Sequence, residues 1–511
     1  MAPNQATPGN QIGRSAASQD EIVLRTDYGV AVAVPASLHS ITTYVLLEQE
    51  RWFERELEFL LRWLSSGMHV VDIGAHVGVY SLPIARKIGT EGRVFAFEPC
   101  ATSRKHLESG RIENGLTNLE VSPCAMSDSE KDGWLQFAEY AEANSLSQSG
   151  LPLGAGEPVS VTTLDVQLRQ GKWPSIDFVK IDAEGEEARI LSGGKDFLGH
   201  HSPLVMFEIQ DKAGPRNALL RGLFGSLGYD TYRLLGDASC LVPVEIDEPL
   251  DSLEVNLFAA KPDRAAALEG NGFCAFASSK AELADDERDK AVDCMLSMPF
   301  ARSFEFSRDD ILECPFREAL VAYAAYRFVR LPPSRRFGAL KAAYACMESQ
   351  LHHNPTPPVV ATFVRVALDL GRRTAARDVL RPMVTELLEQ GHDASLGVLD
   401  QPFFPACERY ESLPIAGRES EWFAASMIEQ LELSHCHSSC YSGDPLIRLQ
   451  WLSESGFDSA EMSRRLILSY ARRNAGPGDL STYLKKSHCH HNALYWSAGG
   501  LQRVSDLLQR R

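Results

Sequence analysis

Apolar and polar residues along this chain follow patterns that predict strands and helices in alternation. Helical spacing of apolar residues fills most of the intervals between the first five apolar runs. Such alternation is typical of a doubly wound α/β sheet. The predicted strands lie near residues 70–74, 93–98, 119–125, 176–182, 203–209, 229–235 and 254–260.

The flanking segments have other patterns. Residues 1–18 are polar and are expected to be flexible, and the segment EQERWFERELEFLLRWLSSG predicts one helix, with Trp52 and Phe53 on its apolar face, ending at Gly67. Residues 263–290 are predicted to be a linker or edge, and 291–511 to form an α-helical domain. Within that domain, residues 360–388 have the pattern of a solenoid-like helical hairpin, although no fixed-period repeat is evident.

Length and composition set the outer limits. A chain of 511 residues with 44% apolar residues is long enough for two or three domains. It has no apolar run of about twenty residues, and its first residues lack the pattern of a signal peptide. We therefore expect a cytoplasmic protein without a membrane span, in which the eleven cysteines are reduced thiols.

Charge is distributed unevenly between the two halves. Residues 1–262 contain 36 acidic and 22 basic residues, whereas the remainder contains 32 and 29. Strong negative charge without a Lys/Arg cluster repels phosphate backbones, so nucleic acid is excluded as the expected partner. A small-molecule or glycan acceptor is more compatible with this negative charge.

The segment VVDIGAHVGVYSLPIA, from Val70, predicts a buried strand that enters a helix through a glycine turn. Gly74 and Gly78 flank His76, and Val79 stands where a dinucleotide fingerprint has its third glycine. NAD is therefore disfavoured. An acid before the turn, Asp72, and an acid closing the next strand, Glu98, suit S-adenosylmethionine, with one acid near the amino-acid part and the other near the ribose.

Three segments together resemble the FkbM family of methyltransferases. They are the D-I-G-A-H-V-G turn at Asp72, the F-E-P strand end at Phe97 and the K-I-D-A-E-G segment at Lys180, and the similarity spans about residues 20–262. The resemblance implies a Rossmann-like methyltransferase sheet with an antiparallel last strand. It also implies S-adenosylmethionine as cofactor, and Ser127 and Asp128 on the adenine side of the cofactor.

Each cofactor-side residue has an expected role. The Gly74 and Gly78 turn is expected to present amide donors to the cofactor carboxylate at a helix N-terminus. Asp72 is placed near the methionine amino group, and Glu98 accepts the ribose hydroxyls. His76 is expected to pack or to hydrogen-bond the backbone rather than to catalyse.

On the acceptor side, methyl transfer to an alcohol needs alignment and removal of a proton. Asp182 follows the fourth strand, at the sheet edge that faces the ligand crevice, and is the first candidate for base or acceptor positioning. Glu208, which ends the next strand, is a second acceptor-binding acid. Glu184 and Lys180 each have a catalytic and a structural interpretation of equal weight. In the structural interpretation, Glu184 caps the turn and Lys180 is a buried ion-pair partner. No metal is expected to be needed.

Two Cys/His clusters lie in the C-terminal half. One is HCHSSC, with His435, Cys436, His437 and Cys440; the other is HCHH, with His488, Cys489, His490 and His491. Neither has the ligand spacing of a known zinc module, so metal binding and ordinary loop positions both stay open.

Two functional hypotheses follow. The first is an S-adenosylmethionine-dependent O-methyltransferase acting on a sugar hydroxyl of a glycan or glycosylated metabolite, the acceptor class that the resemblance suggests. The second is a scaffold or recruitment protein with a regulatory or degenerate cofactor domain. The helical half is expected to select the acceptor or to mediate assembly, with itself or with a protein partner. The identity of the acceptor and the oligomeric state stay open, because acceptor pockets come from variable loops such as 133–158.

Overall fold

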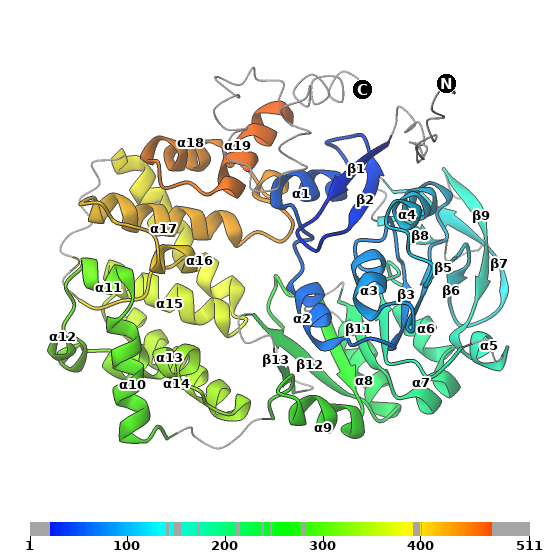
Figure 1. Cartoon of the computed structure of the whole chain (residues 1–511), viewed down its shortest axis with the longest axis horizontal. Helices are drawn as coiled ribbons and strands as arrows, with labels where there is room; N and C mark the ends of the chain where they lie inside the picture. Colours follow the sequence, from blue (N-terminus) through cyan, green and yellow to red (C-terminus); the bar gives the residue numbers. More distant parts are fainter. Residues whose placement is uncertain are drawn as a thin grey trace, which may run out of the picture.

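The computed structural model describes residues 21–472, apart from short internal segments at 139–142, 148–154, 171–172, 210–214, 237–239, 246–247, 249, 277–281, 392–398 and 400. Expectations for residues 1–18 and for the HCHH cluster therefore lie outside the described residues. A sheet-containing region precedes a region of helices, and Figure 1 shows the two on opposite sides of the molecule. Within the described residues, no helix is both long and apolar enough to cross a membrane.

The predicted doubly wound sheet is confirmed as an eight-stranded sheet with the order β13-β12-β14-β11-β10-β3-β4-β5. Neighbouring strands from β11 to β5 pair in parallel, whereas β14 runs antiparallel between β11 and β12, and β13 forms an antiparallel edge. The antiparallel last strand implied by the FkbM resemblance is thus present. The strands are β3 (His69–Ile73), β4 (Arg93–Phe97), β5 (Leu119–Ser122), β10 (Phe178–Ile181), β11 (Leu204–Glu208), β12 (Asp230–Leu235), β13 (Cys240–Pro243) and β14 (Asn256–Ala260).

Helices cover both faces of this sheet because its parallel strands are apolar on both sides. Val70 packs with the core under one layer of helices, and its neighbour Val71 packs with the core under the other. The first layer contains α1 (Ile41–Gln49), α2 (Arg55–Trp63), α3 (Ser81–Ile88), α4 (Ala101–Glu113) and α9 (Pro262–Gly270). The second contains α5 (Leu164–Arg169), α6 (Glu187–Ser192), α7 (Lys195–His201) and α8 (Pro215–Ser226).

One local prediction is wrong in the segment between α1 and α2. The single helix expected around Trp52 and Phe53 is interrupted, because Glu50 adopts a left-handed conformation (φ 61°) and ends α1 five residues before α2 begins. Trp52 and Phe53 therefore lie in a connection between helices. A β-hairpin, β1 (Glu21–Arg25) and β2 (Ala31–Pro35), precedes α1.

The strand expected at 119–125 is split, and the variable loop expected at 133–158 contains strands. β6 (Ala125–Met126) leaves the main sheet and joins β7 (Lys131–Gln136), β8 (Ser145–Leu146) and β9 (Gly156–Thr162) in a second sheet of order β6-β9-β7-β8. Leu135, Val159 and Val161 are buried there with Ala125 and Cys100. The second sheet thus buries an apolar core of its own beside the carboxyl end of β4.

The C-terminal region is helical, as predicted. The expected hairpin is formed by α15 and α16, with Gly371 (φ 79°) at the bend. The helices are α10 (Asp285–Leu296), α11 (Pro299–Ser303), α12 (Arg308–Glu313), α13 (Arg317–Phe328), α14 (Pro333–His353), α15 (Pro357–Asp369), α16 (Arg373–Gln390), α17 (Glu419–Leu433), α18 (Leu446–Ser455) and α19 (Ala460–Arg472), with short 3-10 turns at Glu408–Glu411 and Ser439–Tyr441.

The two regions share buried contacts. Ile467 and Leu468 of α19 pack into the core that contains α1, and Figure 1 shows the two helices side by side. Part of the 263–290 segment, predicted as a linker or edge, is also packed structure, since Ala265 and Leu268 of α9 are buried in the same core. The helical region is therefore packed on the sheet region through α19, and it is also connected to it by the chain that follows β14.

Candidate active site

A cavity of about 300 Å³ opens at the carboxyl ends of β3, β4, β10 and β11, where open α/β sheets bind ligands. It brings together segments that are far apart in the sequence. Of the residues predicted for the site, the cavity is lined by Asp72, Gly74, His76, Glu98, Lys180, Asp182, Glu184 and Glu208. Gly78, Ser127 and Asp128 are not among its lining residues.

Gly74 is required by the close approach of two strand ends. Its φ is 77°, and a Cβ atom there would lie 1.7 Å from the backbone oxygen of Asp182. The Gly74 and Gly78 amides donate to the carbonyl oxygens of Phe97 and Ala75, at 3.0 and 2.8 Å, and contact of the turn with a cofactor carboxylate stays a prediction. Gly78 serves packing, because a Cβ atom there would lie 2.4 Å from Leu107 of α4.

Asp72 and Lys180 are neighbours because β3 and β10 pair in parallel with these two residues in register. The Asp72 carboxylate accepts a hydrogen bond from the Ser81 hydroxyl at 2.6 Å and lies 3.7 Å from the Lys180 ammonium. Burial raises the pKa of Asp72, while Lys180 and Ser81 act in the opposite direction. Burial alone would lower the pKa of Lys180, but Asp182 and Asp72 outweigh it and raise that pKa.

Glu98 is fixed at the end of β4 by two backbone amides. One carboxylate oxygen accepts from the His76 N–H at 2.7 Å, and the other from the Cys100 N–H at 2.8 Å. Burial raises the pKa of Glu98 to about 7, against the effect of these two hydrogen bonds. His76, in a left-handed conformation (φ 48°), contributes its backbone N–H to this arrangement, and the role expected for its side chain stays a prediction.

The residues predicted for the adenine side lie elsewhere. The Ser127 hydroxyl is buried and donates to Glu186 at 2.7 Å, and Asp128 is exposed beside Lys131. The cavity is lined there by the preceding residues Cys124, Ala125 and Met126. Ser127 and Asp128 follow the point where the chain crosses between two sheets, and their contact with adenine stays a prediction.

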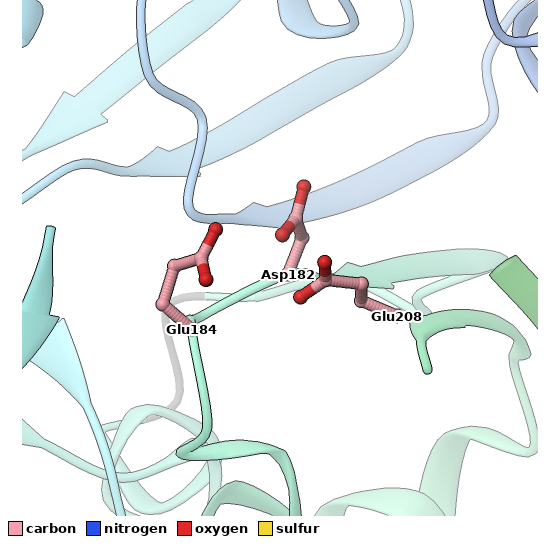
Figure 2. A group of neighbouring side chains, drawn as sticks. All are labelled: Asp182, Glu184 and Glu208. Atoms are coloured by element: carbon pink, nitrogen blue, oxygen red, sulfur yellow. The ribbon is translucent and has the colours of Figure 1, made fainter. Parts of the chain in front are cut away.

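Asp182, Glu184 and Glu208 converge at the other end of the cavity, and one carboxylate oxygen from each lies within 4.8 Å of the others. Figure 2 shows the three side chains coming from two neighbouring strand ends. The Lys180 ammonium lies 2.7 Å from Asp182. Burial, together with the charges of Asp182 and Glu187, raises the pKa of Glu184 to about 7. Such a group of carboxylates can also hold a metal ion, which the spacing of these residues in the sequence does not suggest.

Sequence reasoning missed a group of aromatic and acidic side chains that lines the cavity beside this cluster. Trp52, Phe53, Glu54 and Tyr80 line the cavity, and the Tyr80 hydroxyl donates to the Glu54 carboxylate. Burial raises the pKa of Glu54 to about 8, and nearby acids add to the effect. Asn256, opposite Glu208 in the register of β11 and β14, lines the cavity too.

His437 reaches the same cavity from the helical region. The sequence singles it out only as part of the HCHSSC cluster. Among the described residues, that cluster does not bring three possible ligand atoms as close together as a metal ion needs, whereas the three carboxylates have that spacing. Burial lowers the pKa of His435 to about 4, and nearby arginines add to the effect, so this imidazole is neutral at neutral pH. The open question on the HCHH cluster concerns residues that the structure does not describe.

Comparison with known families confirms the resemblance. Residues 72–231 match the family model of the methyltransferase FkbM domain, which includes all three motif segments. No curated protein matches the chain in sequence.

Solved structures with some similarity include two methyltransferases and one protein in complex with AdoMet. An FkbM methyltransferase from Methylobacillus flagellatus is 16% identical over 38% of this chain and 44% of its own length, with a TM-score of 0.25. An S-adenosylmethionine-dependent O-methyltransferase from Thermotoga maritima is 16% identical over 47% and 77%, with a TM-score of 0.26. TYW2 from M. jannaschii, in complex with AdoMet, is 12% identical over 48% and 86%, with a TM-score of 0.27. Similarity this low does not indicate which substrate this chain uses.

Proposed function

We propose that this chain, whose residues 72–231 form an FkbM methyltransferase domain, transfers the methyl group of S-adenosylmethionine to a hydroxyl group of a small acceptor, with a sugar as the preferred class. One observation carries the proposal. The glycine turn and Glu98 at one end, and the Asp182, Glu184 and Glu208 cluster at the other, line a single cavity.

The cofactor end has polar groups that suit S-adenosylmethionine. Gly74 lines the cavity, and its missing Cβ atom lets the ends of β3 and β10 approach closely at that point. Asp72 lines the cavity with a buried carboxylate, whose oxygen without a hydrogen bond lies 3.7 Å from the Lys180 ammonium; we assign this acid to the amino-acid end of the cofactor. The Glu98 carboxylate keeps lone pairs for the ribose hydroxyls after accepting two backbone amides.

The charge of the cavity as a whole favours neutral or cationic acceptors. Among the described residues that line the cavity, seven carry carboxylates and one, Lys180, carries an ammonium group. Phosphorylated or carboxylated acceptors would be repelled, whereas hydroxyl groups can donate to carboxylates. A sugar supplies several such hydroxyls on one rigid ring.

The cofactor supplies an electrophilic methyl group, and the protein aligns the acceptor oxygen with it and removes the hydroxyl proton. Asp182 is ion-paired with Lys180, which weakens it as a base, so we assign it to acceptor positioning. Glu184, whose pKa is raised to about 7, accepts the proton as the new bond to the acceptor oxygen forms. Glu208 holds a further acceptor hydroxyl.

The scaffold hypothesis is less favoured. A degenerate cofactor domain has no need to keep Asp72, Gly74, Glu98 and Asp182 around one cavity, yet all four line it. The glycine spacing continues to disfavour NAD.

The full chain should be incubated with methyl-labelled S-adenosylmethionine and a panel of neutral sugars, amino sugars and sugar phosphates. We expect label in neutral or amino sugars and none in sugar phosphates. The variant Asp182→Asn should bind the cofactor with unchanged affinity but lose most turnover. Exclusive methylation of sugar phosphates, or failure of the chain to bind S-adenosylmethionine, would contradict the proposal.

A further inference from the structure

We propose that His437, contributed by the helical region, is an acceptor-contacting residue that determines, together with Trp52 and Phe53, which acceptor ring the enzyme accepts. The inference rests on the proposed methyltransferase function and extends it. It makes the helical region part of the acceptor site, rather than an appendage to a self-sufficient domain.

The position of His437 in the cavity is the first support. It lies between α17 and α18 and lines the same cavity as Gly74, Glu98 and Asp182. Its ring packs edge-on against Phe53, with centroids 4.6 Å apart and planes at 88°. Phe53 in turn packs against Trp52 at 4.7 Å. Three rings from two regions thus form one continuous wall.

A chain of contacts places this wall near the acid cluster. The Asp182 carboxylate lies 2.7 Å from the Lys180 ammonium, which lies 5.3 Å from the centre of the Tyr80 ring. The Tyr80 hydroxyl donates to Glu54, the residue that follows Phe53. The wall therefore belongs to the acceptor end of the cavity.

Buried polar contacts fix the segment that carries His437. The Gln49 amide donates to the His437 carbonyl oxygen at 2.7 Å, and the Ser438 hydroxyl donates to Glu48, also at 2.7 Å. Arg465 of α19 lies 3.0 Å from the same Glu48 carboxylate, and both side chains are buried. Because these contacts hold the backbone of the segment in place, the imidazole is positioned before any acceptor arrives.

The chemistry of the wall suits a sugar ring. Aromatic faces cover the apolar C–H face of such a ring, while a nitrogen of an imidazole can hydrogen-bond one of its hydroxyls. The carboxylates opposite take the remaining hydroxyls. A wall of this kind discriminates between acceptors by shape and by the position of one hydroxyl group.

The test uses the full chain and the panel sugar that the wild-type enzyme methylates fastest. In His437→Ala we expect the KM for that sugar to rise about tenfold, the effect of one lost hydrogen bond with its packing, while kcat stays within about threefold. The Kd of S-adenosylhomocysteine, measured by calorimetry, should not change. His437→Phe keeps the ring on Phe53 and should show the same loss of affinity from the missing nitrogens, with unfolding temperature close to that of the wild type.

His435→Phe is the matched control. It changes the same type of residue in the same segment, but His435 is not among the cavity-lining residues, so its KM should stay at the wild-type value. If His437→Ala does not fold, the result with His437→Phe decides.

An unchanged KM in folded His437→Phe would overturn this inference and leave the proposed function standing. A rise in the Kd of S-adenosylhomocysteine that matches the rise in KM would also overturn it, because His437 would then act through the fold. Absence of methylation of every panel sugar by the wild-type enzyme would defeat the proposed function itself, and this inference with it.

Discussion

The two ends of the cavity are built in different ways. At the cofactor end, Gly74, His76 and Glu98 come from two consecutive strand ends, and backbone amides hold the Glu98 carboxylate. At the acceptor end, Asp182 and Glu208 come from two other strands, and His437 comes from the helical region. Like charges are crowded there, with Lys180 between them.

The difference separates a fixed task from a variable one. A cofactor that never changes can be held by backbone geometry, which depends on a few residue types at fixed spacing. An acceptor has to be distinguished from similar molecules, which requires side chains from several directions. Burial and the neighbouring carboxylates raise the pKa of Glu184, which suits its proposed role as base, whereas two backbone amides orient the Glu98 carboxylate for the hydrogen bonds proposed with the ribose.

The largest loss of stability and activity is expected from a substitution that disturbs both the cofactor end and the acceptor end of the cavity. Gly74→Ala places a Cβ atom 1.7 Å from the Asp182 backbone oxygen, on a backbone with φ 77°. We expect destabilisation of about 3 kcal/mol or more, with loss of cofactor binding and turnover. Chemical denaturation and calorimetry measure both. Gly115→Ala is the control, because Gly115 also has a positive φ (63°) but no atom within 4 Å of the added Cβ; equal losses in the two variants would contradict the close-approach argument.

The second effect is confined to the acceptor end. Glu184→Gln cannot accept a proton, so kcat should fall by about 10² to 10⁴ while cofactor affinity stays constant. Because the pKa of Glu184 is raised to about 7, its carboxyl is protonated below that pH, and wild-type kcat should rise as the pH increases through about 7.

A pH series on both proteins checks this assignment. The residual activity of Glu184→Gln should lack the rise near pH 7. A variant that retained both the rise and full turnover would transfer the role of base to another acid, with Glu208 the next to test.

A smaller effect is expected at the cofactor end. Glu98→Gln replaces a charged acceptor by a neutral amide, so the cofactor should bind more weakly by about 1.5 to 3 kcal/mol. Calorimetry with S-adenosylhomocysteine measures the change, and exposed Glu130→Gln is the control. Unchanged affinity in Glu98→Gln would remove Glu98 from the ribose site.

The smallest effect is expected from metal removal. The ammonium of Lys180 already lies 2.7 Å from Asp182, where it partly neutralises the acid cluster, and sulfonium methyl transfer needs no Lewis acid. Turnover should therefore be the same with EDTA and with added Mg²⁺. Loss of activity with EDTA that Mg²⁺ or Mn²⁺ restores would reassign Asp182, Glu184 and Glu208 as metal ligands.

The prediction from sequence succeeded where the pattern is local. Six of the seven predicted strands occur close to their expected ranges, because each is a short apolar run bounded by turn residues. It failed around residues 50–54 and 119–126, where the left-handed Glu50 and a crossing between two sheets change the course of the chain. Neither event has a periodic signal, and tertiary packing overrides local preference there.

The sequence by itself determined the sheet and the turn at Gly74. It also determined which acids stand at the carboxyl ends of the strands. These features depend on the spacing of apolar residues along the chain and on backbone conformations that glycine allows. Only the tertiary structure decided that Asp182, Glu184 and Glu208 meet within 4.8 Å, and that His437 packs on Phe53 at the same cavity. The physical reason is that these contacts join segments whose proximity follows from the packing of whole layers, which no local pattern encodes.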